Sequence, residues 1–165
     1  MVKNSLCYVD TPIGKVGVAE DGTGICALFF ADADPAPPAA LAGATDKTGQ
    51  ETPLLREAAA QLGAYFAGQR KAFDLPLSYH GTPFQMDDWQ ALLSIPYGET
   101  RSYGQIAAQI GRPKAYRAVG MANHNNPIGI IIPCHRVIGS DGSPVGYGGG
   151  LERKIFLLQW EQAHA

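Results

Sequence analysis

A cysteine, a histidine and an arginine follow one another at Cys134, His135 and Arg136, and this run is the strongest candidate for chemistry. A thiol becomes a strong nucleophile only as a thiolate, which requires a nearby base, a cation or a helix N-terminus. His135 and Arg136 supply the first two. Neighbouring side chains of an extended chain point to opposite faces, so Cys134 and His135 would need a tight turn or a bridging water to interact. A buried structural cysteine beside an incidental histidine is the alternative.

The other two of the three cysteines, Cys7 and Cys26, lie in short apolar runs that are typical of strands. An odd number of cysteines without a signal peptide argues against a disulfide framework. We therefore expect Cys7 and Cys26 to act as small buried hydrophobic residues. The four histidines do not have the spacing of metal ligands, so the sequence predicts no metal site.

The length of 165 residues and the 45% hydrophobic composition indicate one domain or two small lobes with a real core. No apolar run approaches the roughly 18 residues that a transmembrane helix needs. The first residues contain no basic region followed by a long apolar stretch and a cleavage site. The sequence therefore predicts a cytoplasmic protein that does not enter a membrane.

The charges are distributed unevenly along the chain. Residues 1–100 hold 6 Lys/Arg and 12 Asp/Glu, whereas residues 101–165 hold 7 Lys/Arg and 3 Asp/Glu. A local basic face can bind phosphate even on a protein whose net charge is −2. The distribution favours a nucleic-acid surface in the last third of the chain, and chance asymmetry in a small protein is the alternative.

The first part of the chain, residues 1–79, predicts an N-terminal α/β lobe with structural duties. Short apolar runs between residues 4 and 31 alternate with turn sequences, which is the pattern of a small antiparallel sheet. Residues 32–50 are rich in Pro, Ala and Asp and predict a flexible loop with no core of its own. A helix follows from a Thr52 cap, and residues 72–79 are a candidate further strand.

Residues 80–165 predict a mostly helical lobe, so the whole chain is expected to be an α+β protein. The capping-box pair Ser102 and Gln105 opens one short helix, and Pro113 starts the next, which is expected to run to about Asn123. Two short helices joined by a glycine-containing turn are typical of a helix-turn-helix. An unrelated helical hairpin is the alternative.

The last helix is expected to begin at Leu151 and to carry Leu151, Ile155 and Leu158 on one apolar face. Glu161 lies one turn beyond Leu158, close to that inward face. A carboxylate in such a position is unusual unless it has a partner, and His135 is a suitable one.

The segments IPYGET, SYGQIA, RAVG, IPCHRVIG and GYGGGLERK, in this order and spacing, resemble the bacterial O6-alkylguanine-DNA alkyltransferases, also called methylated-DNA–protein-cysteine methyltransferases. The resemblance covers nearly the whole chain and is strongest over residues 84–161. It implies DNA repair, in which an alkyl group passes irreversibly from O6-alkylguanine in duplex DNA to Cys134 after the base is flipped out. Each molecule would act once. Activity on O4-alkylthymine stays open.

The resemblance also implies catalytic roles for individual residues. Cys134 matches the alkyl acceptor, and His135 matches the residue that draws off its proton through a water. Glu161 matches the carboxylate that orients and polarises His135. Asn126 matches the asparagine that braces the active-site turn.

DNA delivery and base recognition would involve a second set of residues. Arg117 matches the finger that enters the base stack, and Tyr103 matches the tyrosine that crowds the adjacent phosphate. Lys114 and Tyr116 belong to the expected recognition helix, where they are candidate DNA contacts.

The resemblance further places the backbone of Cys134 and Val137, with the turn at Tyr147 and Gly148, around the guanine edge. It implies no organic cofactor and no catalytic metal. The expected partner is double-stranded DNA containing O6-alkylguanine. The protein is expected to be a monomer in solution, and cooperative clustering on DNA stays open.

Three features depart from the family pattern. Asp88 stands where valine is usual, four residues after Phe84 on the buried stripe of a helix, so we expect it to reach solvent or a basic partner, or the helix to pack differently. Tyr116 stands where alanine is common. Cys7 and Cys26 do not match the ligand spacing of the zinc site that some members have.

Other functions compete with alkyl transfer. A non-catalytic relative would bind alkylated DNA and recruit another repair pathway, but such relatives lack the acceptor that Cys134 provides. A helix-turn-helix regulator with Cys134 as a sensor would need an effector domain, and none is evident. A Cys-His hydrolase would need an oxyanion site, which nothing in the sequence marks.

Overall fold

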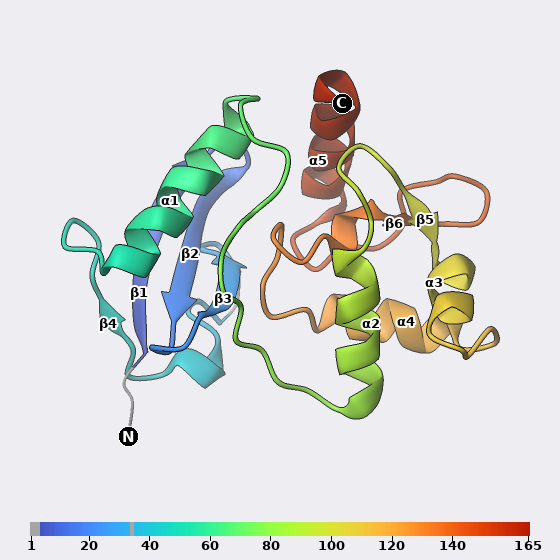
Figure 1. Ribbon diagram of the computed structural model, residues 1–165, viewed down its shortest axis with the longest axis horizontal. Coiled ribbons are helices and arrows are strands. Elements are labelled where there is room, and N and C mark those ends of the chain that lie inside the picture. The colour runs from blue at the N-terminus through green and yellow to red at the C-terminus, as the bar shows by residue number, and fades with distance from the viewer. Residues whose placement is uncertain (1–3, 34) are drawn as a thin grey trace. The chain divides into compact units, whose positions relative to one another are not determined.

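The computed structural model describes residues 4–33 and 35–165, and the chain divides into two compact units, Met1–Tyr79 and His80–Ala165. The first unit combines a sheet with one long helix, and the second is mostly helical (Figure 1). The chain is therefore an α+β protein, as the sequence predicts.

The sheet of the first unit has the strand order β3-β2-β1-β4. Three strands, β1 (Ser5–Thr11), β2 (Gly14–Glu20) and β3 (Ile25–Phe30), form the expected antiparallel meander. The short strand β4 (Thr45–Asp46) pairs with β1 in parallel, so the sheet is mixed rather than purely antiparallel.

Helix α1 (Pro53–Phe66) covers one face of this sheet (Figure 1). It begins where the sequence predicts, because the Thr52 hydroxyl accepts a hydrogen bond from Leu55 N at 3.2 Å and proline occupies the first turn. Its inward stripe is fully buried, as expected for an amphipathic helix over a sheet: Leu55, Ala58, Leu62 and Tyr65.

The segment 32–50 contributes to the core, which the sequence did not predict. Within it lie the short helix η1 (Ala39–Leu41) and strand β4. Leu41 is 4% exposed and packs with Leu6 and Phe29. A single leucine thus anchors a segment whose composition indicates a linker. Residue 34 of this segment, and residues 1–3 of the expected N-terminal lobe, lie outside the described residues.

The predicted strand at 72–79 does not form in the described structure. Only one isolated parallel bridge, between Leu77 and Ile25, joins this segment to β3. Ile25 N donates to Pro76 O and Ser78 N donates to Ile25 O, both at 2.8 Å. These bonds fix the end of the first unit without continuing into a ladder.

The second unit packs helices around a short parallel pair of strands, β5 (Arg101–Ser102) and β6 (Val137–Ile138). Its other elements are α2 (Pro83–Leu93), α3 (Tyr103–Gln109), α4 (Tyr116–His124), η2 (Cys134–Arg136) and α5 (Leu151–His164). No helix in residues 4–33 and 35–165 has the length and apolarity to cross a membrane.

Helices α3 and α4 form the helix-turn-helix, with one difference from the sequence expectation. The capping box of Ser102 and Gln105 opens α3 as predicted. Helix α4 begins at Tyr116 instead of Pro113, because Pro113 and Lys114 belong to the preceding turn. Lys114 therefore lies at the entrance to α4 and not on it.

The buried face of α5 is rotated from the predicted one. Leu151 is 48% exposed, whereas Lys154, Leu157 and Glu161 are buried. The predicted apolar face was drawn through the aliphatic residues Leu151, Ile155 and Leu158. In the structure the buried face instead carries Leu157 with two charged side chains, Lys154 and Glu161. Both charges have partners in the active site described below, which offsets the cost of their burial.

Candidate active site

The turn before Cys134 is held by the side chain of Asn126. Its Oδ1 accepts from Ile128 N at 3.0 Å, and its Nδ2 donates to Ile132 O at 2.8 Å. Within this turn Ile130 adopts a φ of 69°, a left-handed conformation that costs a branched residue about 1–3 kcal/mol. Asn126 Nδ2 also lies 3.3 Å from Cys134 Sγ, so one amide closes the turn and positions the thiol.

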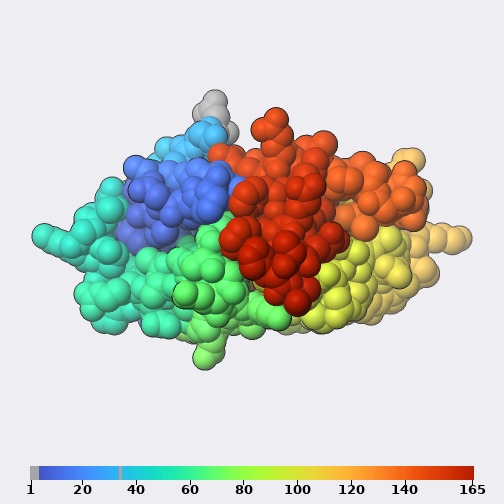
Figure 2. Space-filling model, turned by 90° about the horizontal axis from the view of Figure 1, so that it is seen from above, coloured from blue at the N-terminus to red at the C-terminus, as the bar shows by residue number. Residues whose placement is uncertain are grey.

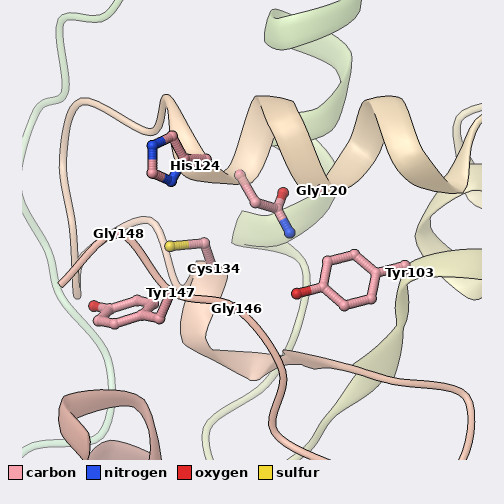
Figure 3. A pocket seen from close by; sticks show the side chains of 8 residues that line it. Tyr103, Gly120, His124, Cys134, Gly146, Tyr147 and Gly148 are labelled. Atoms are coloured by element: carbon pink, nitrogen blue, oxygen red, sulfur yellow. The ribbon is translucent and has the colours of Figure 1, made fainter. Parts of the chain in front are cut away.

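Cys134 opens η2 and lines a cavity of about 180 Å³. Figure 3 shows its sulfur between the side chains of His124 and Tyr147, with Tyr103 on the opposite side of Cys134. The thiol residue is 7% exposed, so a reactant must enter the pocket to reach it. The wall is completed by small and polar residues: Gly120, Asn123, Gly146 and Gly148.

The pocket keeps the resting thiol protonated. Burial raises the pKa of Cys134 to about 11, while the hydrogen bond from Asn126 and the charge of Lys154 act in the opposite direction. The thiol would therefore need a base to become a nucleophile at neutral pH.

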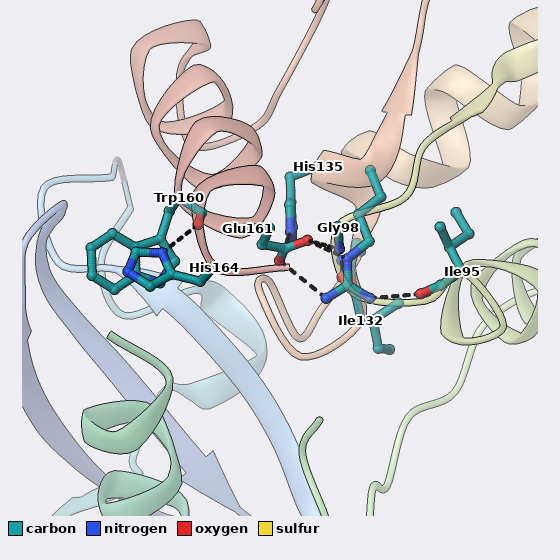
Figure 4. Close-up of polar contacts among 9 residues, drawn as sticks. Ile95, Gly98, Ile132, His135, Trp160, Glu161 and His164 are labelled. Carbon is teal, nitrogen blue, oxygen red and sulfur yellow. Dashed lines mark hydrogen bonds and ion pairs between the residues drawn. The ribbon is translucent and has the colours of Figure 1, made fainter. Parts of the chain in front are cut away.

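That base is provided by a buried network around Glu161 on α5. His135 Nε2 lies 2.7 Å from Glu161 Oε2, and Arg136 binds both carboxylate oxygens, with Nε 2.8 Å from Oε1 and Nη2 3.0 Å from Oε2. Arg136 Nη1 donates to Ile95 O at 2.6 Å, and Gly98 N donates to Glu161 Oε1 at 3.3 Å. Figure 4 shows Glu161 joining the segment at Gly98 to η2.

The charges in this network determine which nitrogen of His135 is available. Burial lowers the pKa of His135 despite the hydrogen bond with Glu161, so the ring is neutral at pH 7. Burial alone would raise the pKa of Glu161, but the hydrogen bonds from His135 and Arg136 bring it well below its usual range. Ionised Glu161 and cationic Arg136 balance each other, and Glu161 accepts the hydrogen on His135 Nε2.

In this tautomer His135 Nδ1 is an acceptor. It is buried and has no hydrogen-bond partner among the described residues. Cys134 Sγ accepts a hydrogen bond from Asn126 Nδ2, and no hydrogen bond joins Sγ to the imidazole in the part of the chain that the structure describes. His135 thus holds an unused basic lone pair next in sequence to a protonated thiol.

Lys154 is a site residue that the sequence reasoning missed. Its side chain is fully buried, and Nζ donates to Val145 O at 2.8 Å and to Gly146 O at 2.9 Å. The Tyr103 hydroxyl donates to the same Val145 carbonyl at 2.8 Å. Burial lowers the pKa of Lys154 to about 8. The correct phase of α5 would have indicated Lys154, because it precedes Glu161 by two turns on the same face.

The residues expected at the guanine edge divide into two groups. Tyr147 and Gly148 line the pocket together with Tyr103. Val137 is buried in β6 opposite Arg101 and is not part of the pocket wall. Asn123, His124, Gly120 and Gly146 line the pocket without having been predicted as site residues.

The residues expected to contact DNA lie at the surface. Lys114, Tyr116 and Arg117 are exposed, and none lines the pocket of Cys134. The Arg117 guanidinium lies 6.0 Å from the centre of the Tyr116 ring, so the unusual tyrosine contacts the expected finger residue. Figure 2 shows the surface of this unit, with its last helix in red and the segment from about 140 to 150 in orange.

The expectation for Asp88 was wrong. Asp88 is 0% exposed, so it does not reach solvent, and Trp89 and Leu92 beside it are buried as an ordinary α2 packing requires. Burial raises the pKa of Asp88 to about 7. Protonation near neutral pH therefore lowers the cost of burying this carboxyl group without a cationic partner. Its neighbour is an amide, Asn123.

Cys7 and Cys26 behave as hydrophobic residues in the first unit. Both thiols are free, Cys7 is buried and Cys26 is half-buried, and burial raises the pKa of each to about 11. Among the described residues, no three His, Cys, Asp or Glu side chains gather in a way that could hold a metal ion.

Two models of known families match this chain. Residues 83–163 match the 6-O-methylguanine DNA methyltransferase DNA-binding domain, and residues 6–79 match the ribonuclease-like domain of the same proteins. The chain belongs to the 6-O-methylguanine DNA methyltransferase family. It is 50% identical to the methylated-DNA–protein-cysteine methyltransferase of Mycobacterium leprae, over 93% of this chain and 90% of that protein. The constitutive Bacillus subtilis enzyme is also 50% identical, over 96% of each chain.

Solved structures of the family have the same fold. The Mycobacterium tuberculosis O6-methylguanine methyltransferase aligns with a TM-score of 0.88 and 46% identity, covering 98% of this chain and 94% of that one. A structure of the same mycobacterial protein in complex with DNA aligns with a TM-score of 0.87 over the same shares. The family and fold predicted from the motifs are thus confirmed.

Proposed function

We propose that this chain repairs duplex DNA by moving an alkyl group from O6-alkylguanine to Cys134 in an irreversible, single-turnover reaction. The observation that carries the proposal is the unpartnered, buried Nδ1 of neutral His135 beside a thiol that faces a pocket. The names of the mycobacterial and Bacillus relatives support the same reaction class.

The residues can account for each proton and electron pair. A water passes the Cys134 proton to His135 Nδ1, and Glu161 stabilises the resulting imidazolium through Nε2. The thiolate attacks the alkyl carbon, a C–S bond forms, and the C–O6 bond breaks. Guanine takes the electron pair, and the proton held by the His135 imidazolium returns through water to guanine, so the ring ends neutral. The product thioether has no leaving group for a second reaction, so Cys134 is consumed.

Delivery of the base is assigned to the exposed helix-turn-helix. A base inside the stack cannot reach a thiol that is 7% exposed, so it must rotate into the pocket. Arg117 fills the vacated place in the stack, and Tyr103 favours rotation of the adjacent phosphate. Lys114 and Tyr116 contact the flanking DNA.

Recognition of the flipped base uses backbone groups that the family resemblance identifies. The backbone of Cys134 contacts the guanine edge, and the turn at Tyr147 and Gly148 covers the pocket. Val137 does not line the pocket, so we assign it only the support of η2 from β6. Asn126 keeps the active-site turn in place through its bonds to Ile132 O and Sγ.

We assign DNA binding and alkyl transfer to residues 80–165 and a structural role to residues 1–79, in which Leu41 and β4 join the segment 32–50 to the sheet. The partner is double-stranded DNA that contains O6-alkylguanine, bound by a monomer in the cytoplasm.

The alternative function is a non-catalytic protein that binds alkylated DNA and recruits another repair pathway. The residues of the site do not favour it. A protein that only binds damaged nucleobases has no use for a thiol nucleophile, for an asparagine that orients the thiol, or for a buried imidazole that can accept its proton. All three are present at Cys134, Asn126 and His135.

The test is the intact mass of the protein after incubation with a duplex that contains one O6-methylguanine. We expect a gain of one methyl group, located on Cys134 by peptide mapping, with at most one transfer per molecule. Cys134→Ser should abolish the gain, and the control Cys26→Ser, in the other unit, should retain it. Tight binding of the damaged duplex without any mass gain would favour the recruiter.

A further inference from the structure

Asp88 is a buried titratable group that the proposed reaction does not use. It lies on α2, is 0% exposed, and burial raises the pKa of its carboxyl group to about 7. When the amide of Asn123 is oriented to satisfy its surroundings, its Nδ2 donates to Asp88 Oδ2 at 2.6 Å and to Oδ1 at 3.2 Å. The carboxyl group is thus held by a neutral amide, which does not balance its charge when it ionises.

The same amide connects Asp88 to the surroundings of Cys134. Asn123 lines the pocket of Cys134, and α2 packs both against α4, which carries Asn123, and against η2, which carries Cys134. Charges interact more strongly in a protein interior than in water, because the interior screens them less. Ionised Asp88 accordingly raises the pKa of the Cys134 thiol.

The thiol of Cys134 therefore experiences two buried charges of opposite sign. The ammonium group of Lys154 lowers the pKa of Cys134, whereas ionised Asp88 raises it. A different set of causes acts on the pKa of the neighbouring imidazole: burial, Glu161, Arg136 and Lys154. The charge of Asp88 thus acts on the thiol rather than on the base that takes its proton.

We propose that Asp88 controls the reactivity of Cys134 through its charge, because ionisation of the buried carboxyl group opposes formation of the thiolate and protonation removes this opposition. Asp88 is a positioning residue and not a catalytic one, since its charge acts through Cys134 and not on the substrate. The inference deepens the proposed function and rests on it only where transfer from DNA is concerned. A valine at this position, which the family pattern favours, would have no such effect.

The direction of the effect depends on pH. At pH 5.5 Asp88 is mostly protonated and neutral, and at pH 8.5 it is mostly ionised, because its pKa is about 7. The thiolate fraction of Cys134 rises with pH, but the ionisation of Asp88 moves the pKa of the thiol upwards over the same range. The rate of a thiolate reaction should therefore rise less steeply in the wild type than in a variant with a neutral residue at position 88.

Other titratable groups lie on α2 and on the elements that pack against it, α3, α4 and η2. They are Asp87 on α2, Tyr103 on α3, Tyr116, Arg117 and His124 on α4, and Cys134, His135 and Arg136 on η2. These groups are the same in the wild type and in a variant of residue 88. The ratio of the two rates at one pH therefore isolates the contribution of Asp88.

The experiment measures the reaction of Cys134 with iodoacetamide in the full chain without DNA, between pH 5.5 and pH 8.5. The thiolate displaces iodide, and peptide mapping separates the product at Cys134 from those at Cys7 and Cys26. We expect Asp88→Asn to react at the wild-type rate at pH 5.5 and about threefold to tenfold faster at pH 8.5, the effect of removing one nearby like charge. The rate ratio should change with a midpoint near pH 7.

A second variant separates charge from packing. Asp88→Asn keeps an acceptor for Asn123 Nδ2, whereas Asp88→Val removes it, so the same pH-dependent ratio in both variants would assign the effect to the charge. The control Asp87→Asn, at the exposed neighbouring position, should behave as wild type at every pH. A rate ratio of one throughout, a ratio that does not change with pH, or an effect in only one of the two variants would overturn the proposal.

The same proteins distinguish this inference from the proposed function. Single-turnover methyl transfer from a duplex containing O6-methylguanine is measured with the wild type in parallel. A pH-dependent iodoacetamide ratio without any transfer from DNA would refute the proposed function and support the control by Asp88. Transfer from DNA with an iodoacetamide ratio of one at every pH would overturn the control by Asp88 alone.

Discussion

The buried network around Glu161 and the exposed entrance to α4 belong to the same unit but are built in opposite ways. Glu161 is 1% exposed and accepts hydrogen bonds from His135, Arg136 and Gly98. Lys114, Tyr116 and Arg117 are exposed, and the ring contact between the last two is loose. The reacting groups are thus held by hydrogen bonds in the free protein, whereas we propose that the groups assigned to DNA take their final positions on binding.

This difference has an energetic basis. A catalytic base must be held in one tautomer, and a buried ion pair with several hydrogen bonds supplies that order. A side chain that contacts phosphate or enters the base stack gains its partner only when DNA binds. Burying such a side chain in the free protein would cost desolvation energy that no interaction offsets. Mutations in the two regions should therefore affect different measurements.

Glu161→Gln should give the largest effect. It leaves Arg136 buried without its counter-charge, and we expect a loss of about 3 kcal/mol in the free energy of unfolding. Transfer should slow about 100-fold or more, because His135 loses the anion that stabilises its protonated form. Urea unfolding and single-turnover transfer measure the two effects.

The matched control is Glu99→Gln, because Glu99 pairs with Arg101 at 3.3 Å on the surface. An exposed pair contributes at most about 1 kcal/mol, so stability and transfer should stay near the wild type. Equal losses in the two variants would contradict the distinction between buried and exposed carboxylates.

The acid dependence of stability follows from the same carboxylate. The pKa of Glu161 is lower in the folded state than in the unfolded state, whose value is about 4.3. Its stabilisation is therefore complete above that pH and is lost progressively as the pH falls. Between pH 7 and pH 3 the wild type should lose more unfolding free energy than Glu161→Gln, and parallel losses in urea titrations would argue against this source.

Arg117→Ala should have an intermediate effect that depends on the substrate. Transfer from O6-methylguanine in a duplex should slow at least about tenfold, equivalent to about 1.4 kcal/mol, while transfer from the free base should stay near the wild-type rate. Arg112→Ala is the control, because Arg112 is exposed and lies 5.5 Å from the Phe84 ring. Similar losses on duplex and free base would remove Arg117 from base flipping.

Lys114→Ala should give the smallest effect. It removes one phosphate contact, so the slope of log K against log salt should become shallower by about 1, without a change in the transfer rate once DNA is bound. Binding at several salt concentrations measures this slope. Lys71→Ala, in the other unit, should leave the slope unchanged, and an unchanged slope for Lys114→Ala would place that side chain away from the backbone.

Much of the fold followed from local patterns. The caps at Thr52 and Ser102 form as their sequences predict, because a hydroxyl three residues before a backbone N–H satisfies it without any tertiary partner. The short strand β4 and the burial of Leu41 were not predictable, because they depend on pairing and packing between segments that are distant along the chain.

The site was predicted where its motif is dense and missed where it depends on three-dimensional packing. Asn126 contacts Cys134 and His135 contacts Glu161, while the catalytic roles of these four residues stay predictions. Lys154 was overlooked because the spacing of the aliphatic residues predicted a different buried face for α5, on which Lys154 does not lie. The partner of Asp88 lies on another helix, and no local rule connects Asp88 to Asn123.

The position of Glu161 has a consequence for biosynthesis. Glu161 follows His135 by 26 residues and lies on the last helix of the described structure. At usual elongation rates the ribosome makes that stretch in about 1–5 s, after Cys134 has already been polymerised. Until α5 docks, His135 has no carboxylate and the thiol has no oriented base. The nascent chain therefore becomes competent for alkyl transfer only when the whole unit has folded.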